Sequence, residues 1–442
     1  MKFEIHALNT SSSTSNQETW FFDNLLCEIY APNGERVRYE ETGLAEEWRR
    51  RSEQDPIKRA SSEKKYIRTL RLSLGLNCNR HCSYCLQAPY RQVIAPFPDK
   101  DRIVRFFKAF DNAGYELSPS GKIAIWGGEP LVYWKALLIL IPMLRDKFGQ
   151  GIRIRFHTNG LLMTAEKAEF LAKHRIEVLI SHDAQGNSLR EDIDPLLSDS
   201  HIRSSWLRLH ELTAGTNYAM RFNTVLTPRN ADILKIREFF TVHFAETVLF
   251  DISGIVSYEA ASFPEGTFKP IERSLLSSGI FHALLWEADR WPSLAVLRDG
   301  VMKPIVCHQP LYSSTARCKP RSDDALTVGI DGRILFCHNR PEVIGNLTDK
   351  DNGRSAETLI PVLHSWNDRP SCRSCPVVAF CRGACPILSE DVRRRACSNE
   401  ALFYLSIFRA AWFSLTGTVM MSIRPHTKQK NQSFPVLPIL RG

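Results

Sequence analysis

Residues 78–85 read Cys78-Asn79-Arg80-His81-Cys82-Ser83-Tyr84-Cys85, which spaces three thiols as C-x3-C-x2-C. Three cysteines this close in the chain can all reach one small metal cluster. A [4Fe-4S] cluster is normally held by four cysteines, one for each iron. A triplet without a fourth cysteine nearby therefore predicts a cluster with one open iron, and open coordination positions are typical of catalytic rather than structural metal sites.

Two simpler interpretations of this triplet are a set of disulfides and a zinc site. Disulfide frameworks are typical of small secreted chains, whereas this chain has 442 residues. Its first residues, Met1 to His6, also lack the basic stretch and apolar run of a signal peptide. Zinc is usually bound by two C-x2-C pairs rather than by a lone triplet. The spacing therefore favours an iron-sulfur cluster.

The last third of the chain holds a second ordered set of cysteines. It consists of Cys318, then Gly332 followed after four residues by Cys337, then Cys372, Cys375, Cys381 and Cys385 at C-x2-C-x5-C-x3-C spacing, and finally Cys397. Seven ligands are one short of the eight that two four-iron clusters need. Cys307, shortly before Cys318, is the unassigned cysteine nearby. A pair of zinc ribbons is the alternative interpretation.

Both cysteine sets resemble those of the radical S-adenosylmethionine (SAM) enzymes of the SPASM subgroup, and Tyr84 stands at the aromatic position of their first cysteine loop. The resemblance implies S-adenosyl-L-methionine and three [4Fe-4S] clusters as cofactors. One catalytic cluster would be held by Cys78, Cys82 and Cys85, one auxiliary cluster by Cys307, Cys318, Cys337 and Cys385, and the other by Cys372, Cys375, Cys381 and Cys397. Whether Cys307 is a ligand stays open, and without it one auxiliary iron would be free to contact substrate.

Between the two cysteine sets the chain alternates between strand-like and helical patterns. Apolar strand-like runs occur at residues 67–74, 122–126, 152–156, 177–181, 219–226 and 248–252. Ile103, Phe106, Phe107 and Phe110 recur at helical spacing, and Gly114 follows as a stop. Six such units are too few for a closed eight-stranded barrel and predict an open parallel sheet. The resemblance likewise implies an α/β fold, a partial (β/α)6 barrel followed by a small cysteine-rich SPASM domain with two auxiliary clusters.

Parallel α/β sheets carry their reactive groups in the loops after the carboxyl ends of the strands. The cysteine triplet follows the first predicted strand, and a Gly127-Gly128-Glu129 run follows the second. Two glycines would let backbone groups approach a ligand closely, although a plain turn is the alternative. After the fourth strand, period-two alternation places Ser181 and Asp183 on one face.

By resemblance, these strand-end loops bind the cofactor. Gly127, Gly128 and Glu129 would meet its amino group, Ser181 and Arg190 its carboxylate, and Asn223 and Val225 its adenine and ribose, while Asn159 belongs to a further motif of the subgroup, His157-Thr158-Asn159-Gly160. A solvated surface position is the alternative for Arg190.

The resemblance implies a reaction in which a 5′-deoxyadenosyl radical abstracts hydrogen from a substrate, and SPASM enzymes mostly modify peptides and proteins. In sulfatase-maturing members a basic aspartate directly follows the second SPASM cysteine. Here that residue is His338, which disfavours formylglycine formation even though a histidine can also accept a proton. A purely structural role for His338 stays open as well.

We therefore expect a maturase that installs a carbon-carbon, ether or thioether crosslink in a ribosomally made precursor peptide. A formylglycine-generating sulfatase maturase is one alternative. An RNA-modifying radical SAM enzyme and a non-catalytic metal-binding protein are alternatives of other classes. The choice of a peptide substrate rests on family analogy rather than on residue chemistry.

We expect five segments: an N-terminal extension (1–65), the barrel core (66–255), a helical linker (256–306), the SPASM domain (307–400) and a C-terminal helix and tail (401–442). The extension contains strand-like pieces at 20–23, 25–30 and 36–39 and a charged helical stretch at 46–59. It could bind an extended precursor peptide along a strand edge or pack against the barrel. Residues 401–422 are apolar, but Arg409 in their middle disfavours a membrane span. The tail after Arg424 is expected to be poorly ordered.

The net charge of +9, from 57 basic and 48 acidic residues, is modest for this length. Because no stacking-rich basic motif accompanies it, nucleic acid is not an expected partner. The expected partners are a precursor peptide and a reductant such as flavodoxin or ferredoxin. Cluster thiolates need reduced thiols, so the cysteine usage indicates the cytoplasm. The remaining cysteine, Cys27, lies in an apolar stretch and is expected to be a small buried side chain.

Overall fold

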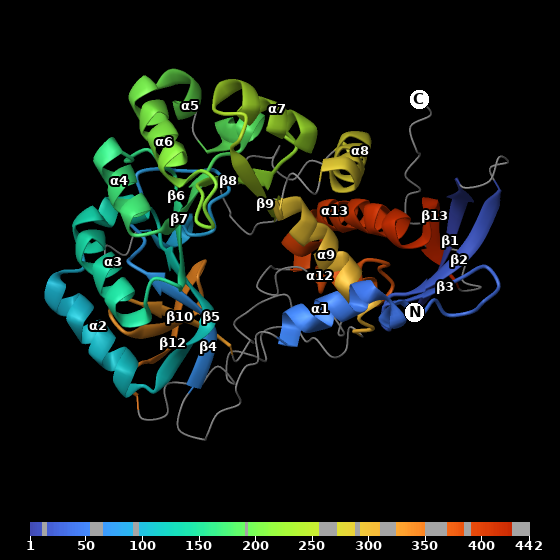
Figure 1. The fold of residues 1–442 in the computed structure, drawn as a ribbon, viewed down its shortest axis with the longest axis horizontal. Helices are drawn as coiled ribbons and strands as arrows, with labels where there is room; N and C mark the ends of the chain where they lie inside the picture. The colour runs from blue at the N-terminus through green and yellow to red at the C-terminus, as the bar shows by residue number, and fades with distance from the viewer. Residues whose placement is uncertain are drawn as a thin grey trace.

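A computed structural model describes residues 1–10, 16–53, 65–91, 97–190, 193–255, 272–287, 292–309, 324–349, 369–383 and 390–426. Its centre is a curved sheet whose six parallel strands follow one another in chain order (Figure 1). They are β4 (Lys65–Ser73), β5 (Tyr115–Trp126), β6 (Arg153–Thr158), β7 (Ile176–Ser181), β8 (Arg221–Leu226) and β9 (Leu249–Ile255). The predicted open sheet of six parallel strands is confirmed.

Three further strands extend this sheet beyond β4. β10 (Ala325–Gly329) pairs with β4 in parallel, and β11 (Arg333–Cys337) and β12 (Arg340–Asn346) follow as antiparallel neighbours. Nine strands therefore form one mixed sheet. Residues 325–346, which we expected in the cysteine-rich domain, instead extend the core sheet. The sequence does not reveal this, because a pairing between strands more than 200 residues apart leaves no local signal.

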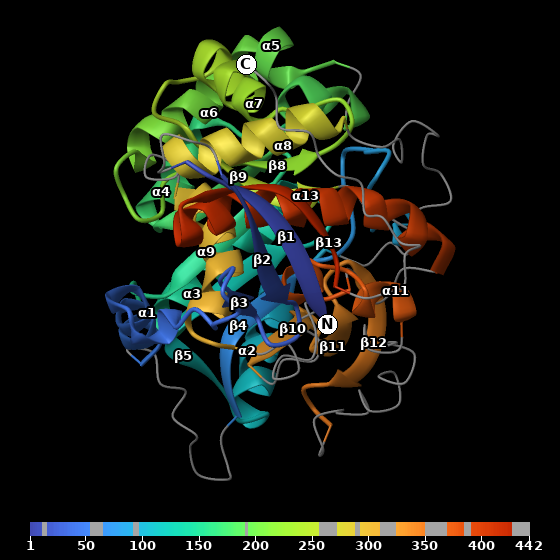
Figure 2. The same ribbon diagram turned by 90° about the vertical axis from the view of Figure 1, so that its right-hand side faces the viewer.

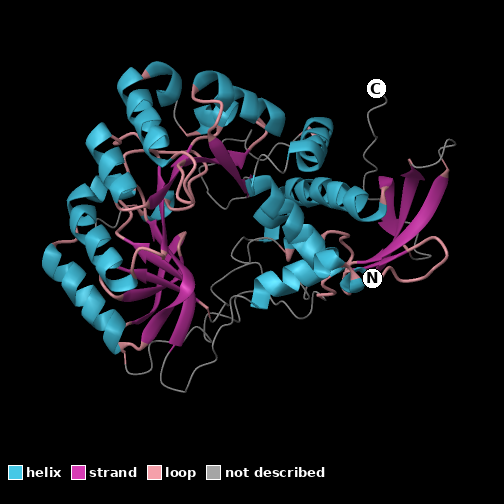
Figure 3. Cartoon of the chain, in the orientation of Figure 1, coloured by secondary structure: helices cyan, strands magenta, loops and turns pink. Residues whose placement is uncertain are grey.

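Helices cover the outer face of the parallel strands (Figure 3). They are α2 (Lys100–Asn112), α3 (Trp134–Phe148), α4 (Ala165–Lys173), α6 (Ser200–Thr213) and α7 (Ile233–His243). In α2 the four predicted apolar residues, among them Phe106 and Phe110, are buried, and Asp99 caps the helix by accepting a hydrogen bond from the Arg102 amide at 2.8 Å. Gly114 follows with φ of 72°, as expected for a helix stop.

A second, four-stranded sheet joins the two ends of the described chain (Figure 2). Its order is β13 (Thr418–Pro425), β1 (Lys2–Asn9), β2 (Gln17–Asp23) and β3 (Glu28–Tyr30), all antiparallel. The expected helix over residues 401–422 was wrong for residues 417–422, and Arg424 and Pro425, expected in the poorly ordered tail, belong to a strand. The helix ends before Gly417, whose φ of 68° stops it, and the chain then pairs with β1.

Long helices connect this sheet to the barrel. α13 (Glu390–Thr416) packs against α8 (Arg273–His282) and α9 (Pro292–Val306) of the expected linker. The N-terminal extension packs on this side rather than on the barrel, since Phe22 of β2 stacks on Phe380 and Phe408. Arg409 of α13 donates to the Ser277 hydroxyl at 2.8 Å. Within the described residues, no helix combines the length and apolar character that crossing a bilayer requires.

The remaining elements are short. They are η1 (Tyr39–Glu41), α1 (Gly43–Glu53), η2 (Ala88–Tyr90), η3 (Pro130–Tyr133), η4 (Ala184–Leu189), α5 (Pro195–Ser198), η6 (Ala283–Glu287), α11 (Pro370–Arg373) and α12 (Val378–Cys381). η3 closely follows β5 and η4 closely follows β7, so these two strand-end loops are held by short helical turns.

Candidate active site

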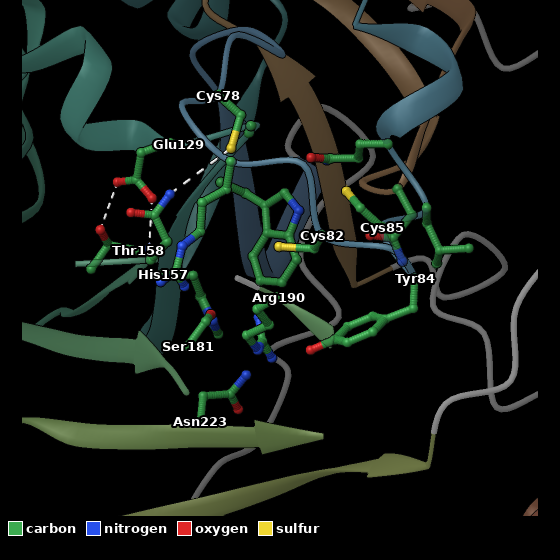
Figure 4. Close-up of a pocket in the computed structure, with 18 of the residues that line it drawn as sticks. Cys78, Cys82, Tyr84, Cys85, Glu129, His157, Thr158, Ser181, Arg190 and Asn223 are labelled. Atoms are coloured by element: carbon green, nitrogen blue, oxygen red, sulfur yellow. Dashed lines mark hydrogen bonds between the residues drawn. The ribbon is translucent and has the colours of Figure 1, made fainter. Parts of the chain in front are cut away.

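A cavity of about 370 Å³ lies at the carboxyl ends of the parallel strands (Figure 4). Every residue that the sequence predicted for the catalytic cluster and for SAM lines it, and so does His338. These residues are Cys78, Cys82, Tyr84, Cys85, Gly127, Gly128, Glu129, Asn159, Ser181, Arg190, Asn223 and Val225. The volume falls in the range of small-molecule sites.

The diglycine after β5 is required by its packing against the cluster loop. A Cβ atom at Gly127 would collide with the Gly75 carbonyl oxygen, and one at Gly128 with the Asn77 carbonyl oxygen. The Gly128 amide donates to the Gly75 carbonyl at 3.0 Å, and the Glu129 amide donates to the Asn77 carbonyl at 2.8 Å. These two glycines therefore let two loops approach each other, a reason for them that is independent of any ligand.

The Glu129 carboxylate is a buried junction between two strand ends. It accepts hydrogen bonds from the Thr158 hydroxyl at 2.6 Å, the Asn159 amide at 2.6 Å and the Leu131 amide at 2.9 Å. Its side chain is 1 % exposed. Burial raises the pKa of this carboxyl, and the three hydrogen bonds oppose that rise. Glu129 thus fixes the loop after β6 against the loop after β5.

Asp183 is a functional residue whose role the sequence analysis missed. It is fully buried and accepts hydrogen bonds from Arg190 Nε at 2.7 Å, Arg190 Nη2 at 2.9 Å, the Val225 amide at 2.9 Å and the Tyr84 hydroxyl. The Arg190 guanidinium also lies over the Tyr84 ring, 5.2 Å from its centroid. The predicted alternation with Ser181 was the available signal, because it placed Asp183 on the face of the cavity.

Arg190 is held inside the site rather than in solvent. Its side chain is 9 % exposed. Burial acts to lower the pKa of this guanidinium, but the Asp183 charge raises it above its ordinary value. His182, on the opposite face, is fully buried and contacts Asp194 at 2.9 Å. The solvated alternative for Arg190 is therefore wrong, and the predicted alternation of strand β7 is confirmed.

The three thiols sit among basic groups. Burial raises the pKa of both Cys78 and Cys82, which disfavours the free thiolates. Arg91 Nη2 lies 3.0 Å from the Cys85 sulfur, and Arg80 and Arg91 both line the cavity. Such cations suit an anionic cluster, and the basic residues within and after the loop were a signal that the sequence analysis did not use.

The three thiols line one cavity, and three thiolates are a donor set that an iron-sulfur cluster can use. A four-iron cluster is larger than one ion and keeps its thiolates further apart. Three cysteines around one cavity therefore fit such a cluster, with Cys78, Cys82 and Cys85 as the residues that would hold it.

One indole ring and two imidazole rings together form one wall of the cavity. The Trp126 ring lies 4.4 Å from the His157 ring and 4.7 Å from the His338 ring, between centroids. Burial lowers the pKa of His157 to about 3 and that of His338 to about 4, so both rings are neutral near pH 7. The Gln87 side chain donates to the His338 carbonyl at 2.9 Å. Trp126 and His157 were not predicted as site residues.

The structure partly describes the second cysteine set. Burial raises the pKa of Cys375 to about 12, and the charge of Cys397 also acts on it. The Cys375 amide donates to the Cys372 carbonyl at 3.1 Å. Cys381 ends α12, Cys337 ends β11, and half-buried Cys307 follows α9. Cys318 and Cys385 lie outside the described residues. The N-terminal extension reaches this region, since Asn24 donates to the Cys375 carbonyl at 2.7 Å.

Sequence comparison shows what this site is similar to. Residues 72–234 match the Radical SAM superfamily. The radical SAM cyclopropyl synthase TigE of Paramaledivibacter caminithermalis is 22% identical over 345 residues, which cover 72% of this chain and 68% of TigE. The molybdenum cofactor biosynthesis protein 1 of Dictyostelium discoideum is 30% identical over 199 residues, but these cover 41% of this chain and only 28% of that protein.

Solved structures resemble the fold. The native anSMEcpe structure with bound AdoMet superimposes with a TM-score of 0.55 at 18% identity, covering 79% of this chain and 98% of that one. Streptococcus suis SuiB bound to precursor peptide SuiA gives a TM-score of 0.50 at 13% identity, covering 83% and 92%. A curved parallel sheet with a cysteine triplet at its strand ends defines a class of metal-dependent enzymes. Within that class, this chain is a radical SAM enzyme, and its residues 72–234 match the radical SAM superfamily.

Proposed function

We propose that this enzyme is a SPASM-type maturase that installs an oxidative crosslink between side chains of a ribosomally made precursor peptide. The observation that carries the proposal is the single cavity that collects the three thiols, the predicted cofactor contacts and His338. When bound, the cluster and SAM supply hydrogen abstraction through a 5′-deoxyadenosyl radical. The protein then has to position the cofactor and the substrate and exclude water.

The residues around the cavity divide this work. Ser181, Asn223 and Val225, which end neighbouring strands β7 and β8, would hold the cofactor opposite the cysteine loop. Arg190 already donates to Asp183 with Nε and Nη2. We infer that Arg190 acts mainly by fixing the cysteine loop through Asp183 and Tyr84, and less as the carboxylate ligand that the resemblance implied.

The relatives support a peptide substrate. SuiB was solved with a precursor peptide, and another anSMEcpe structure contains a Cp18Cys peptide. Burial lowers the pKa of His338 to about 4, so its imidazole is neutral near pH 7 but only a weak proton acceptor. Formylglycine formation is the second candidate function, because His338 stands where that reaction uses a base, and the low pKa of His338 disfavours it.

We also propose that the cysteines after residue 307 bind two auxiliary clusters. The contact of Cys375 with Cys372, and the charge of Cys397 that acts on Cys375, support the second of them. The N-terminal sheet would then be an element for the precursor peptide, which is supported by its contact with the cysteine region through Asn24 and by the capacity of sheet edges to pair with extended peptides.

Anaerobic reconstitution tests this proposal. Three four-iron clusters predict about twelve irons per chain, together with release of 5′-deoxyadenosine when SAM and a reductant are added. Replacing Cys78, Cys82 and Cys85 together with alanine should abolish that release and leave about eight irons. Cys27→Ala is the matched control, because Cys27 is buried outside the cavity, and it should leave both readouts unchanged.

The substrate class is tested separately by co-expression with a neighbouring short open reading frame. The mass of the purified peptide should fall by two hydrogens for each crosslink. Release of 5′-deoxyadenosine by the triple variant would contradict the role of the cysteine loop. An unmodified peptide beside active enzyme would contradict only the choice of that peptide.

A further inference from the structure

The parallel strands have one apolar face and one polar face. Ile154 and Phe156 of β6 and Phe222 of β8 are buried under the outer helices. Alternate residues on the same strands are Arg153, Arg155 and Arg221. Parallel sheets are normally covered on both faces and carry apolar residues on each. The inner face here is polar at these positions, and the Arg153 side chain is 49 % exposed.

This inner face gathers several positively charged side chains. Among the described residues its cations are Arg71, Lys122, Arg153, Arg155 and Arg221, and we call this set the basic face. The strand register aligns Lys122 with Arg153, and the charges of Arg71 and Lys122 act on the cavity histidines. The carboxylates among them are Glu177 and Asp251.

Three of these arginines share one carboxylate. Glu177 is 2 % exposed and is approached by Arg155 at 2.8 Å, Arg153 at 3.0 Å and Arg221 at 3.6 Å. Burial would raise the pKa of Glu177, but the hydrogen bond and charge of Arg155, followed by Arg153 and Arg221, lower it. Each guanidinium offers five N–H groups. The three guanidiniums around the Glu177 carboxylate therefore have further N–H donors with which to bind another anion.

The basic face continues into the cavity. His157 follows Arg155 by two residues on β6, and Asn223 follows Arg221 by two residues on β8, so each pair shares the inner face. His157 and Asn223 line the cavity. An extended chain that enters the site along the sheet would therefore pass these arginines first.

We propose that the basic face binds carboxylates of the peptide substrate next to the residue that reacts. This inference rests on the proposed peptide substrate and specifies its chemistry as acidic. The carboxylates belong to Asp or Glu side chains or to the peptide's carboxyl terminus. Guanidinium groups suit them because the planar fork can donate two parallel hydrogen bonds to one carboxylate.

Fluorescence anisotropy with the full-length protein tests the inference. The probes are labelled octapeptides of alternating Gly and Glu, or Gly and Gln, each with an amidated or a free carboxyl terminus. At low salt the amidated Glu peptide should bind about tenfold more tightly than the amidated Gln peptide, and physiological salt should narrow this difference. Preference for the free acid of the Gln peptide over its amide would identify the carboxyl terminus as the source.

Three single variants distinguish peptide binding at the basic face from a general effect of the protein's positive charge. Arg153→Gln should weaken binding of the Glu peptide about threefold while leaving the Arg155 contact with Glu177 in place. Asp251→Asn should tighten binding about twofold, because it releases Arg221 from its 3.4 Å contact. Arg203→Gln, on the exposed side of α6, is the matched control and should change nothing. A gain of affinity cannot come from misfolding.

Equal binding of all four peptides overturns the inference, and so does equal weakening by Arg153→Gln and Arg203→Gln. Release of 5′-deoxyadenosine by the same preparations tests the proposed function separately from the anion-binding role of the basic face. Active enzyme without a preference for acidic peptides refutes only the basic face. A clear preference in protein that never releases 5′-deoxyadenosine refutes the proposed function and leaves the anion site in place.

Discussion

Replacing Asp183 with asparagine tests whether one buried carboxylate holds the cysteine loop against the sheet. The change keeps the shape of the side chain but removes its charge, so the Arg190 guanidinium, 9 % exposed, loses its counter-ion. Breaking a buried ion pair from one side costs about 3 to 5 kcal/mol. The Tyr84 hydroxyl, which donates to the same carboxylate, would also lose a charged acceptor. Asp183→Asn should therefore lower the free energy of unfolding by at least about 3 kcal/mol.

A double-mutant cycle isolates the pair. Arg190→Gln leaves Asp183 buried without its cation, whereas the Asp183→Asn/Arg190→Gln variant removes both charges together. The double variant should thus lose about 2 kcal/mol less than the sum of the single variants, near the upper end of couplings between contacting residues. Asp146→Asn, on the exposed side of α3, is the control and should stay within about 0.5 kcal/mol of the wild type.

The measurement is urea unfolding of the cluster-free protein, followed by circular dichroism, with the slope of the transition compared between variants. Iron retained after gel filtration of reconstituted protein gives a second readout, because Tyr84 lies between two of the cluster cysteines. Additive losses, with a coupling below about 0.5 kcal/mol, would refute the idea that Asp183 and Arg190 act as one tether.

Two further predictions follow from the same cavity. Gly128→Ala should destabilise the protein by about 1 to 3 kcal/mol in the same urea assay, since the added Cβ meets backbone oxygens of Leu76 and Asn77. Gly151→Ala is the control, because nothing lies within 4 Å of a Cβ added there. Equal effects of the two substitutions would contradict the packing argument. His157, whose pKa is about 3 when folded and 6.5 ordinarily, takes up a proton below pH 6.5 only in the unfolded chain, so the wild type loses stability as the pH falls. His157→Gln should remove up to about 2 kcal/mol of the loss between pH 7 and pH 5, and identical pH profiles for the two proteins would show that the ring is not held neutral.

Local patterns in the sequence were enough to predict the site. The cysteine triplet and the diglycine follow apolar strands and Ser181 ends one, and the ends of parallel strands meet at one edge of a sheet. Strands β4 to β9 also lie in the sheet in their order along the chain. Every predicted residue of the catalytic cluster and of the SAM site therefore lines one cavity.

Features that depend on distant pairing were not predictable. β13 forms only because β1 offers it a partner at the other end of the chain, and β10 joins β4 across the whole barrel. The partner of Arg190 was missed for a related reason. Asp183 is seven residues earlier, and nothing in their spacing shows that the turn η4 (Ala184–Leu189) folds the guanidinium back onto that carboxylate.

The cysteine loop is tied to the sheet on both of its sides. On one side the Gly75 and Asn77 carbonyls accept hydrogen bonds from the Gly128 and Glu129 amides of the loop after β5, and the Tyr133 hydroxyl accepts from the Asn77 amide at 2.9 Å. On the other side the Ser83 amide and hydroxyl both donate to the Leu189 carbonyl at 3.0 Å. These bonds involve no cluster ligand, so the loop can keep its shape before iron arrives. Its thiols are then arranged by the protein rather than by the metal, which fits a site whose open iron must face the cofactor in one fixed direction.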